Sequence, residues 1–161
     1  MLLRKLTEND LDLYKEIRLE GLQESPSSFG SSYEEEILYT KSDWLKFFES
    51  DLFGTFDLDG NLLGVAGFYV SKGLKLQHKG FVFGMYVRTE RRGKGLGKAL
   101  LEEVILHARN RVSYLYLNCE VNNISALNLY KSQGFEIYGT EKNAIKVEDH
   151  FLDQHLMVLT L

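Results

Sequence analysis

The sequence predicts a single domain of the mixed α/β class, with a sheet that contains both antiparallel and parallel strands. Two observations predict this class. An apolar run over residues 81–87 is followed by a glycine-rich loop, an amphipathic stretch and a second apolar run over residues 113–121, the order strand, helix, strand. Earlier in the chain, two apolar runs flank Asp59-Gly60-Asn61, which is typical of a turn between antiparallel strands.

The N-terminal third predicts one strand and two helices. Residues 2–6 alternate in polarity as a short strand does, and the helix-capping residues 7–10 precede apolar side chains at helical spacing up to Leu22. Pro26, among several serines, ends that helix and begins a loop. A second helix is expected from about residue 42 to residue 50, with one aromatic face.

The rest of the chain supplies most of the sheet. Residues 52–58 and 62–70 are predicted as strands joined by a type I′ turn, and the polar stretch 71–80 as a loop. A helix over residues 96–109 separates strands 81–87 and 113–121, and a connection of this length makes the two strands parallel neighbours. After one more helix, residues 136–141 and 151–161 are expected as closing strands, with a long polar connection over residues 143–150.

Composition excludes several classes of protein. The chain has 161 residues, 44% of them hydrophobic, which suits one domain spanning residues 1–161. The single cysteine excludes internal disulfides, and no stretch resembles a membrane helix or a secretion signal, so a cytoplasmic protein without a membrane partner is expected. The net charge of −4 argues against nucleic-acid binding and favours a cationic substrate. The four histidines lack metal-ligand spacing, so no metal is predicted.

The most informative stretch is the loop over residues 88–101. Alternate glycines at 93, 95 and 97 let several backbone N–H groups point into one concavity at a helix N-terminus, which makes an anion site. A P-loop is excluded because Arg92 and Ala99 stand where it needs glycine and a hydroxyl. A dinucleotide fingerprint is excluded because Lys98 and Leu100 stand where its last glycine would fall.

Two blocks at a particular spacing match a known family. The first is Arg92-x-x-Gly95-x-Gly97, and the second, over residues 123–135, reads Asn-x-x-Ala-x-x-x-Tyr-x-x-x-Gly-Phe. Together they resemble the GCN5-related N-acetyltransferase (GNAT) superfamily, clearly over about residues 80–135 and by element order over the whole chain. The resemblance implies the GNAT fold, with about seven strands, about four helices, and parallel strands 81–87 and 113–121 that splay apart.

The resemblance also implies an activity. It is direct transfer of an acetyl group from acetyl-CoA to a primary amine, with a small-molecule amine expected; the alternatives are a protein N-terminus or lysine, or an acyl-CoA sensor without turnover. The loop would bind the pyrophosphate, the strand ending at residue 87 would pair with the pantetheine arm, and dimers are common in the family. The cofactor-binding residues implied are Met85, Tyr86, Val87, Arg92, Gly93, Lys94, Gly95, Leu96, Gly97, Lys98 and Asn123.

The catalytic residues follow in part. By resemblance, Tyr130 is the general acid that protonates the leaving thiolate, and it shares a helix face with Asn123. Relatives carry a glutamate where this chain has Phe81 or Asn118, neither of which accepts a proton. Glu120 is the leading candidate for the base, with water ordered by Asn118 as the alternative.

The sequence also suggests residues that could contact the amine substrate, and a role for the single cysteine. The acidic run that begins with Glu34 and Glu35 is typical of a solvated helix start, and its functional interpretation is a wall that attracts an amine. The substrate candidates are therefore Glu34, Glu35 and Asn118. Cys119 is predicted to be a packed strand residue, because no basic side chain neighbours it in the sequence.

Overall fold

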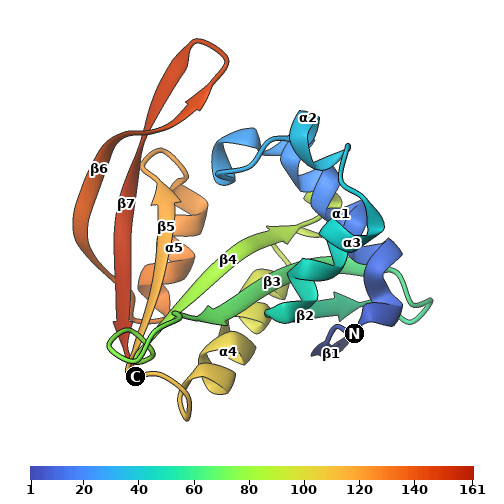
Figure 1. Cartoon of the computed structure of the whole chain (residues 1–161), viewed down its shortest axis with the longest axis horizontal. Helices are drawn as coiled ribbons and strands as arrows, with labels where there is room; N and C mark the ends of the chain where they lie inside the picture. Colours follow the sequence, from blue (N-terminus) through green and yellow to red (C-terminus); the bar gives the residue numbers. More distant parts are fainter.

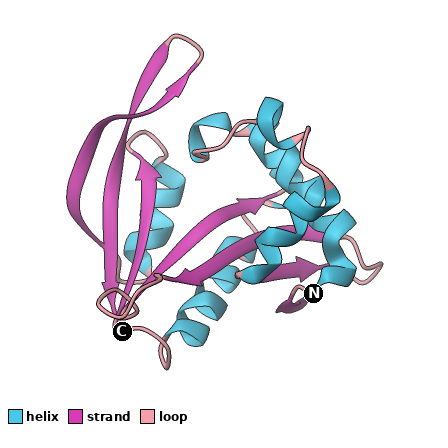
Figure 2. Cartoon of the chain, in the orientation of Figure 1, coloured by secondary structure: helices cyan, strands magenta, loops and turns pink.

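The computed structural model describes all 161 residues as one seven-stranded mixed sheet with helices on both faces (Figures 1 and 2). The strand order is β1-β2-β3-β4-β5-β7-β6, with β4 and β5 parallel and every other pair antiparallel. The strands are β1 (Leu2–Lys5), β2 (Asp51–Phe56), β3 (Leu62–Val70), β4 (Lys79–Val87), β5 (Tyr114–Glu120), β6 (Glu136–Val147) and β7 (His150–Thr160). The predicted class is confirmed.

Five α-helices and four short 3-10 turns accompany the sheet. The helices are α1 (Leu11–Glu24), α2 (Tyr33–Glu36), α3 (Lys41–Leu45), α4 (Leu96–Ala108) and α5 (Ile124–Ser132). The 3-10 turns are η1 (Glu8–Asp10), η2 (Pro26–Ser28), η3 (Lys46–Glu49) and η4 (Thr89–Arg91). None of the helices combines the length and the apolar character that crossing a membrane requires.

The parallel pair β4–β5 opens into a fork (Figure 1). Only three residue pairs join the two strands, the last of them Phe81 with Tyr116. Beyond that pair β5 stays paired with β7 along its whole length, while β4 continues beside β3. Because a strand edge without a partner presents free backbone groups, the fork leaves the facing edges of β4 and β5 available to a ligand.

A bulge bends β4 where it borders the fork. Val65 pairs with Tyr86 and Gly67 pairs with Phe83, so Gly84 and Met85 together oppose one residue of β3. Gly84 has φ +58°, in the left-handed region that favours glycine. The bulge therefore turns the strand at the point where the cavities described below meet.

Two hydrophobic clusters hold the helices to the sheet. One joins α4 and α5 to the inner strands through residues such as Leu100, Leu115 and Met157, all fully buried. The other packs α1 and α3 against β2 and β3 through Tyr14, Trp44 and their neighbours. Burial of such side chains stabilises each by about 1.5–3 kcal/mol, so both faces of the sheet anchor the strands that form the site.

Two sequence predictions about connections were wrong. The turn after β2 spans residues 57–61, and only Gly60 has positive φ (84°), so it is a type I turn with a bulge glycine rather than type I′. The Asp57 carboxylate stabilises it by accepting the N–H groups of Asp59 and Asn61. The polar stretch 143–150 is mostly strand, because β6 and β7 form a long hairpin with a two-residue turn.

Candidate active site

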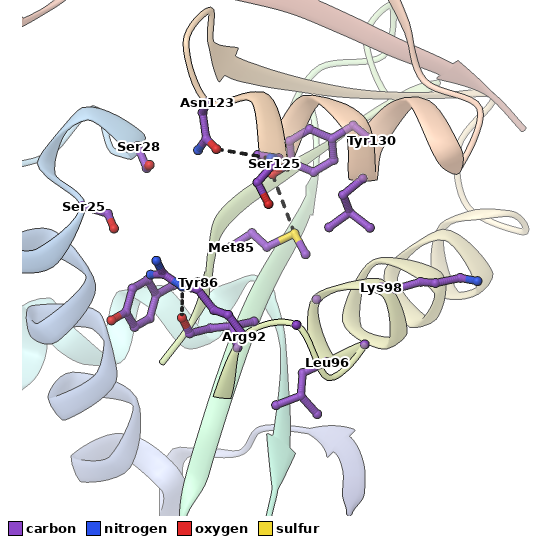
Figure 3. A pocket seen from close by; sticks show the side chains of 16 residues that line it. Ser25, Ser28, Met85, Tyr86, Arg92, Leu96, Lys98, Asn123, Ser125 and Tyr130 are labelled. Atoms are coloured by element: carbon purple, nitrogen blue, oxygen red, sulfur yellow. Dashed lines mark hydrogen bonds between the residues drawn. The ribbon is translucent and has the colours of Figure 1, made fainter. Parts of the chain in front are cut away.

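A cavity of about 350 Å³ lies where β4 ends, between the glycine loop, the start of α4 and the start of α5 (Figure 3). We call it the loop-side cavity. Its walls combine backbone-exposing glycines, one arginine, one lysine and the polar end of α5. It is lined by Ser25, Ser28, Met85, Tyr86, Val87, Arg92, Gly93, Gly95, Leu96, Gly97, Lys98, Asn123, Ser125, Ala126, Leu129 and Tyr130.

The glycine loop takes a backbone conformation that side chains disfavour. Gly93 and Gly95 have φ of 72° and 80°, and a Cβ on either would meet no atom within 4 Å. Backbone conformation, and not crowding, therefore requires glycine there. The N–H of Ala99 is the first to bond within the helix, to the carbonyl of Gly95 at 3.0 Å. The N–H groups of residues 96–98 precede it and have no helical acceptor, which makes them an anion-binding end.

Cationic side chains border this cavity unequally. Arg92 is fixed at its edge, because its Nε donates to the carbonyl of Val87 at 2.9 Å and its guanidinium lies 5.4 Å from the Tyr86 ring centroid. Lys98 also lines the cavity and lies 3.7 Å from Glu102. Lys94 does not line it, so the structure does not bring this sequence candidate into the cavity wall.

A carboxylate stripe on α1 holds the end of β4. The Tyr86 hydroxyl lies 2.6 Å from Glu24 Oε2 and 3.0 Å from Glu20 Oε1, while Arg88 pairs with Glu20 and with Glu16 at 2.6 Å. Burial, and then the two carboxylates, raise the pKa of Tyr86 above its usual value. The four-residue spacing of the three glutamates is visible in the sequence, but their partners 62 to 72 residues away are not.

A second, smaller cavity of about 90 Å³ fills the β4–β5 fork. We call it the fork cavity. It is lined by Ser28, Val82, Phe83, Gly84, Met85, Leu117, Asn118, Cys119, Glu120, Asn123, Ala126 and Tyr130. Five residues line both cavities, namely Ser28, Met85, Asn123, Ala126 and Tyr130. The two cavities therefore meet in the fork beside the β4 bulge.

Tyr130 stands at this junction with a weakly bonded hydroxyl. The side chain is 9% exposed, and its hydroxyl donates to Met85 Sδ at 3.7 Å (Figure 3). A thioether is a weak acceptor, so a stronger one in the cavity would take this hydrogen bond. Burial raises the pKa of Tyr130 above its usual value. Asn123 caps α5 by accepting the N–H of Ala126 at 3.2 Å, which leaves its amide NH₂ free to donate.

Glu120 lines the fork cavity, and one of its two carboxylate oxygens is bonded to the protein. Oε1 accepts the backbone N–H and the side-chain amide of Asn122, at 3.1 and 3.0 Å, while Oε2 has no protein partner. Glu120 is 7% exposed, and Asn118 lines the same cavity two residues earlier. Its neighbour Cys119 is buried, and burial raises the pKa of that thiol to about 12. Cys119 is therefore a packed thiol and not a thiolate nucleophile.

The three glutamates of α2 lie in two different environments, two of them along a surface groove and one in the interior. Glu34 and Glu35 line a groove of about 550 Å³ between this segment and the tip of the β6–β7 hairpin, apart from both cavities. Glu36 is fully buried and accepts Arg18 Nε at 2.9 Å and Nη2 at 2.7 Å, so the expected solvated helix start is wrong for this residue. The Arg18 guanidinium also packs 4.8 Å from the Phe29 ring centroid.

Two serines reach the site from η2 and from the residue before it, although neither was among the predicted site residues. Ser25 lines the loop-side cavity and Ser28 lines both cavities, from the side opposite α5 (Figure 3). The turn η2 itself contacts β5 and β6, and so covers part of the fork. The serine-rich composition of this stretch was visible as a loop signal, but which strands the loop crosses depends on tertiary packing.

Comparison with known proteins places these features in a family. Residues 18–135 match the model of the acetyltransferase (GNAT) family. The chain is 30% identical over 102 residues to the L-amino acid N-acetyltransferase AaaT of Escherichia coli (strain K12), a match covering 62% of each protein. The matched part thus spans less than two thirds of that relative's length.

Solved structures extend the likeness to the whole chain. Ribosomal-protein-alanine N-acetyltransferase from Brucella melitensis superposes with a TM-score of 0.86 at 26% identity and 100% coverage of both chains. The structure of yncA from Salmonella typhimurium with its cofactor acetyl-CoA has a TM-score of 0.87, covering 100% of this chain and 94% of that one. At 20% identity, this second likeness shows the fold alone. The matched family model spans both the glycine loop and α5, and the chain belongs to the acetyltransferase (GNAT) family.

Proposed function

We propose that this protein is an N-acetyltransferase that moves the acetyl group of acetyl-CoA directly to a small primary amine. The observation that carries the proposal is the meeting of two cavities at Tyr130, one ending on the anion-binding glycine loop and the other containing Glu120. Both substrates fit this arrangement at once, so no acyl-enzyme is required. Because Cys119 is a buried thiol with a raised pKa, the fork offers no thiolate to form one.

The loop-side cavity supplies the groups that acetyl-CoA needs. The N–H groups at the start of α4 and the Arg92 guanidinium suit a pyrophosphate, since backbone donors and a fixed cation both favour anions. The free edge of β4 at Met85 suits the amides of the pantetheine arm, as an added strand would. The free amide NH₂ of Asn123 supplies a further donor from the facing helix.

The chain's own residues manage the two protons of the reaction. As the C–N bond forms and the C–S bond breaks, Tyr130 donates its hydroxyl hydrogen to the leaving sulfur, in place of its weak contact with Met85. The nitrogen loses two protons in the reaction, and the second of them returns through water to the Tyr130 oxygen. Glu120 receives the ammonium proton at Oε2, directly or through water held by Asn118. Its held Oε1 keeps the carboxylate aimed at the cavity, and its charge attracts a cationic amine.

A small amine suits the fork better than a protein. The fork cavity holds about 90 Å³, enough for a few water molecules, and η2 covers part of it by contacting β5 and β6. The names of the similar proteins include both classes, since AaaT acts on L-amino acids and the Brucella protein on a ribosomal-protein alanine. Since acetyl-CoA is its co-substrate, we also propose a cytoplasmic location.

Binding and turnover measured on one sample test this proposal. Calorimetric titration with acetyl-CoA, coenzyme A and NAD should give saturable binding for the two coenzyme A compounds only. Thiol release should then follow with members of a panel of amino acids and simple alkylamines, and not with alanine-initiated peptides. Turnover of the peptides alone would contradict the small-amine assignment. Binding without turnover of any member would favour an acyl-CoA sensor.

A further inference from the structure

We propose that the amine substrate carries an aromatic or other large apolar group. This group would bind in a separate cavity with aromatic walls beside the fork, which we call the aromatic cavity. This inference rests on the proposed acetyltransferase function and specifies its acceptor. The aromatic cavity has a volume of about 500 Å³ and lies under α3, on the sheet face away from α4. Four aromatic side chains form its walls: Tyr39, Phe47, Tyr69 and Phe83.

Phe83 joins this cavity to the acceptor site. It lines the fork cavity beside Gly84 and lines the aromatic cavity with its neighbour Tyr69, the two ring centroids being 5.7 Å apart. The Phe83 ring lies on the backbone of β3, where a Cβ on Gly67 would come within 2.4 Å of it. Gly67 thus leaves room for the ring to lie flat. Phe83 is thus the one residue that lines both the fork cavity, where Glu120 lies, and the aromatic cavity.

The walls favour an apolar and uncharged occupant. The charged residues of the cavity, Asp43 and Lys46, pair with each other at 2.9 Å, and Asp43 also accepts the Thr40 hydroxyl at 2.8 Å. The two charges therefore neutralise each other, and the remaining surface of the aromatic cavity is largely aromatic. Tyr69 is 42% exposed although its ring stacks on Phe81 at 5.3 Å, so one ring face and edge stay open to solvent. Aromatic rings of this kind bind other rings in stacked or edge-to-face contacts.

Selectivity between matched amines tests the inference. We would measure kcat/KM for phenethylamine against ethylamine and for L-phenylalanine against L-alanine in the wild type, Tyr69→Ala and Tyr69→Phe. The matched control is Phe151→Ala, which removes an aromatic side chain that is 61% exposed on the β6–β7 hairpin. We expect a wild-type preference for the phenyl-bearing amine of about tenfold or more. Tyr69→Ala should abolish most of it, while Tyr69→Phe and Phe151→Ala should keep it.

A binding signal that needs no turnover supports the same test. Trp44 is the only tryptophan, and its ring centroid lies 5.7 Å from Tyr39 and 5.6 Å from Phe47. Phenethylamine should therefore change Trp44 fluorescence saturably, and ethylamine should not.

Each other outcome has a definite meaning. Equal losses for both amines in Tyr69→Ala, or no loss for either, would overturn the aromatic subsite. Conversion of a dimer to a monomer by Tyr69→Ala with unchanged selectivity would assign the surface to a second copy of the chain, and also overturn it. Thiol release with ethylamine or L-alanine but no phenyl preference would refute this inference alone. Absence of thiol release with all four amines would instead refute the proposed function.

Discussion

Replacing Gly95 with valine isolates the contribution of the glycine loop to coenzyme binding. Gly95 has φ 80°, and a Cβ there would meet no atom within 4 Å, so the substitution introduces backbone strain without a steric clash. An L-residue in the left-handed region costs about 1–2 kcal/mol, and a β-branched one is the least tolerated. In the free protein the loop has room to relax. Binding must then restore the left-handed conformation, so the cost appears in the dissociation constant.

The expected effect is a rise in the dissociation constant of coenzyme A by about 5- to 30-fold, measured by calorimetric titration. Gly60→Val is the matched control, because Gly60 has φ 84° and equally open surroundings in the turn after β2, and it lines neither the loop-side cavity nor the fork cavity. That control should lose stability in urea unfolding and keep its coenzyme affinity. Wild-type affinity in Gly95→Val, or an equal loss in Gly60→Val, would refute the assignment of the loop to the pyrophosphate.

Three further substitutions test other parts of the site and fold. Tyr130→Phe should lower kcat by about 10²- to 10⁴-fold with unchanged coenzyme affinity, and equal losses in both would remove Tyr130 as the general acid. Since burial raises the pKa of Tyr130, the hydroxyl keeps its proton, and the wild-type rate should not decline between neutral pH and about pH 10. Glu120→Gln should lower kcat and leave coenzyme affinity unchanged, because the amide cannot accept the ammonium proton; an unchanged kcat would assign deprotonation to water. Glu36→Gln leaves the Arg18 charge buried and should cost about 3–5 kcal/mol in urea unfolding, whereas a cost below about 1 kcal/mol would mean that Arg18 finds another partner.

The parts that the sequence predicted are those encoded by neighbouring residues. The glycine loop and the helix that follows it each depend on a few consecutive positions, and the structure has them at the expected places. The parallel pairing of β4 and β5 also followed, because the length of the connecting segment restricts the topology.

Contacts between distant segments could not be predicted in the same way. In the sequence, Arg18 and Glu36 are two charged residues with no sign that they meet. In the fold they form a buried ion pair with two hydrogen bonds, because α1 and α2 pack together. The stretch 143–150 is polar because both faces of the long β6–β7 hairpin are largely exposed, so polarity there did not distinguish strand from loop. Ser28 reaches both cavities only because η2 crosses the fork.

The most direct test of the account follows an isotopically labelled acetyl group. The protein would be incubated with labelled acetyl-CoA, with and without an amine that supports thiol release, and both the protein and the small molecules would be analysed by mass spectrometry. Direct transfer in the fork predicts label in the amine, one thiol released for each acetyl transferred, and no label on the protein when the amine is omitted. Stoichiometric label on Cys119 that moves to the amine on its addition would contradict the account.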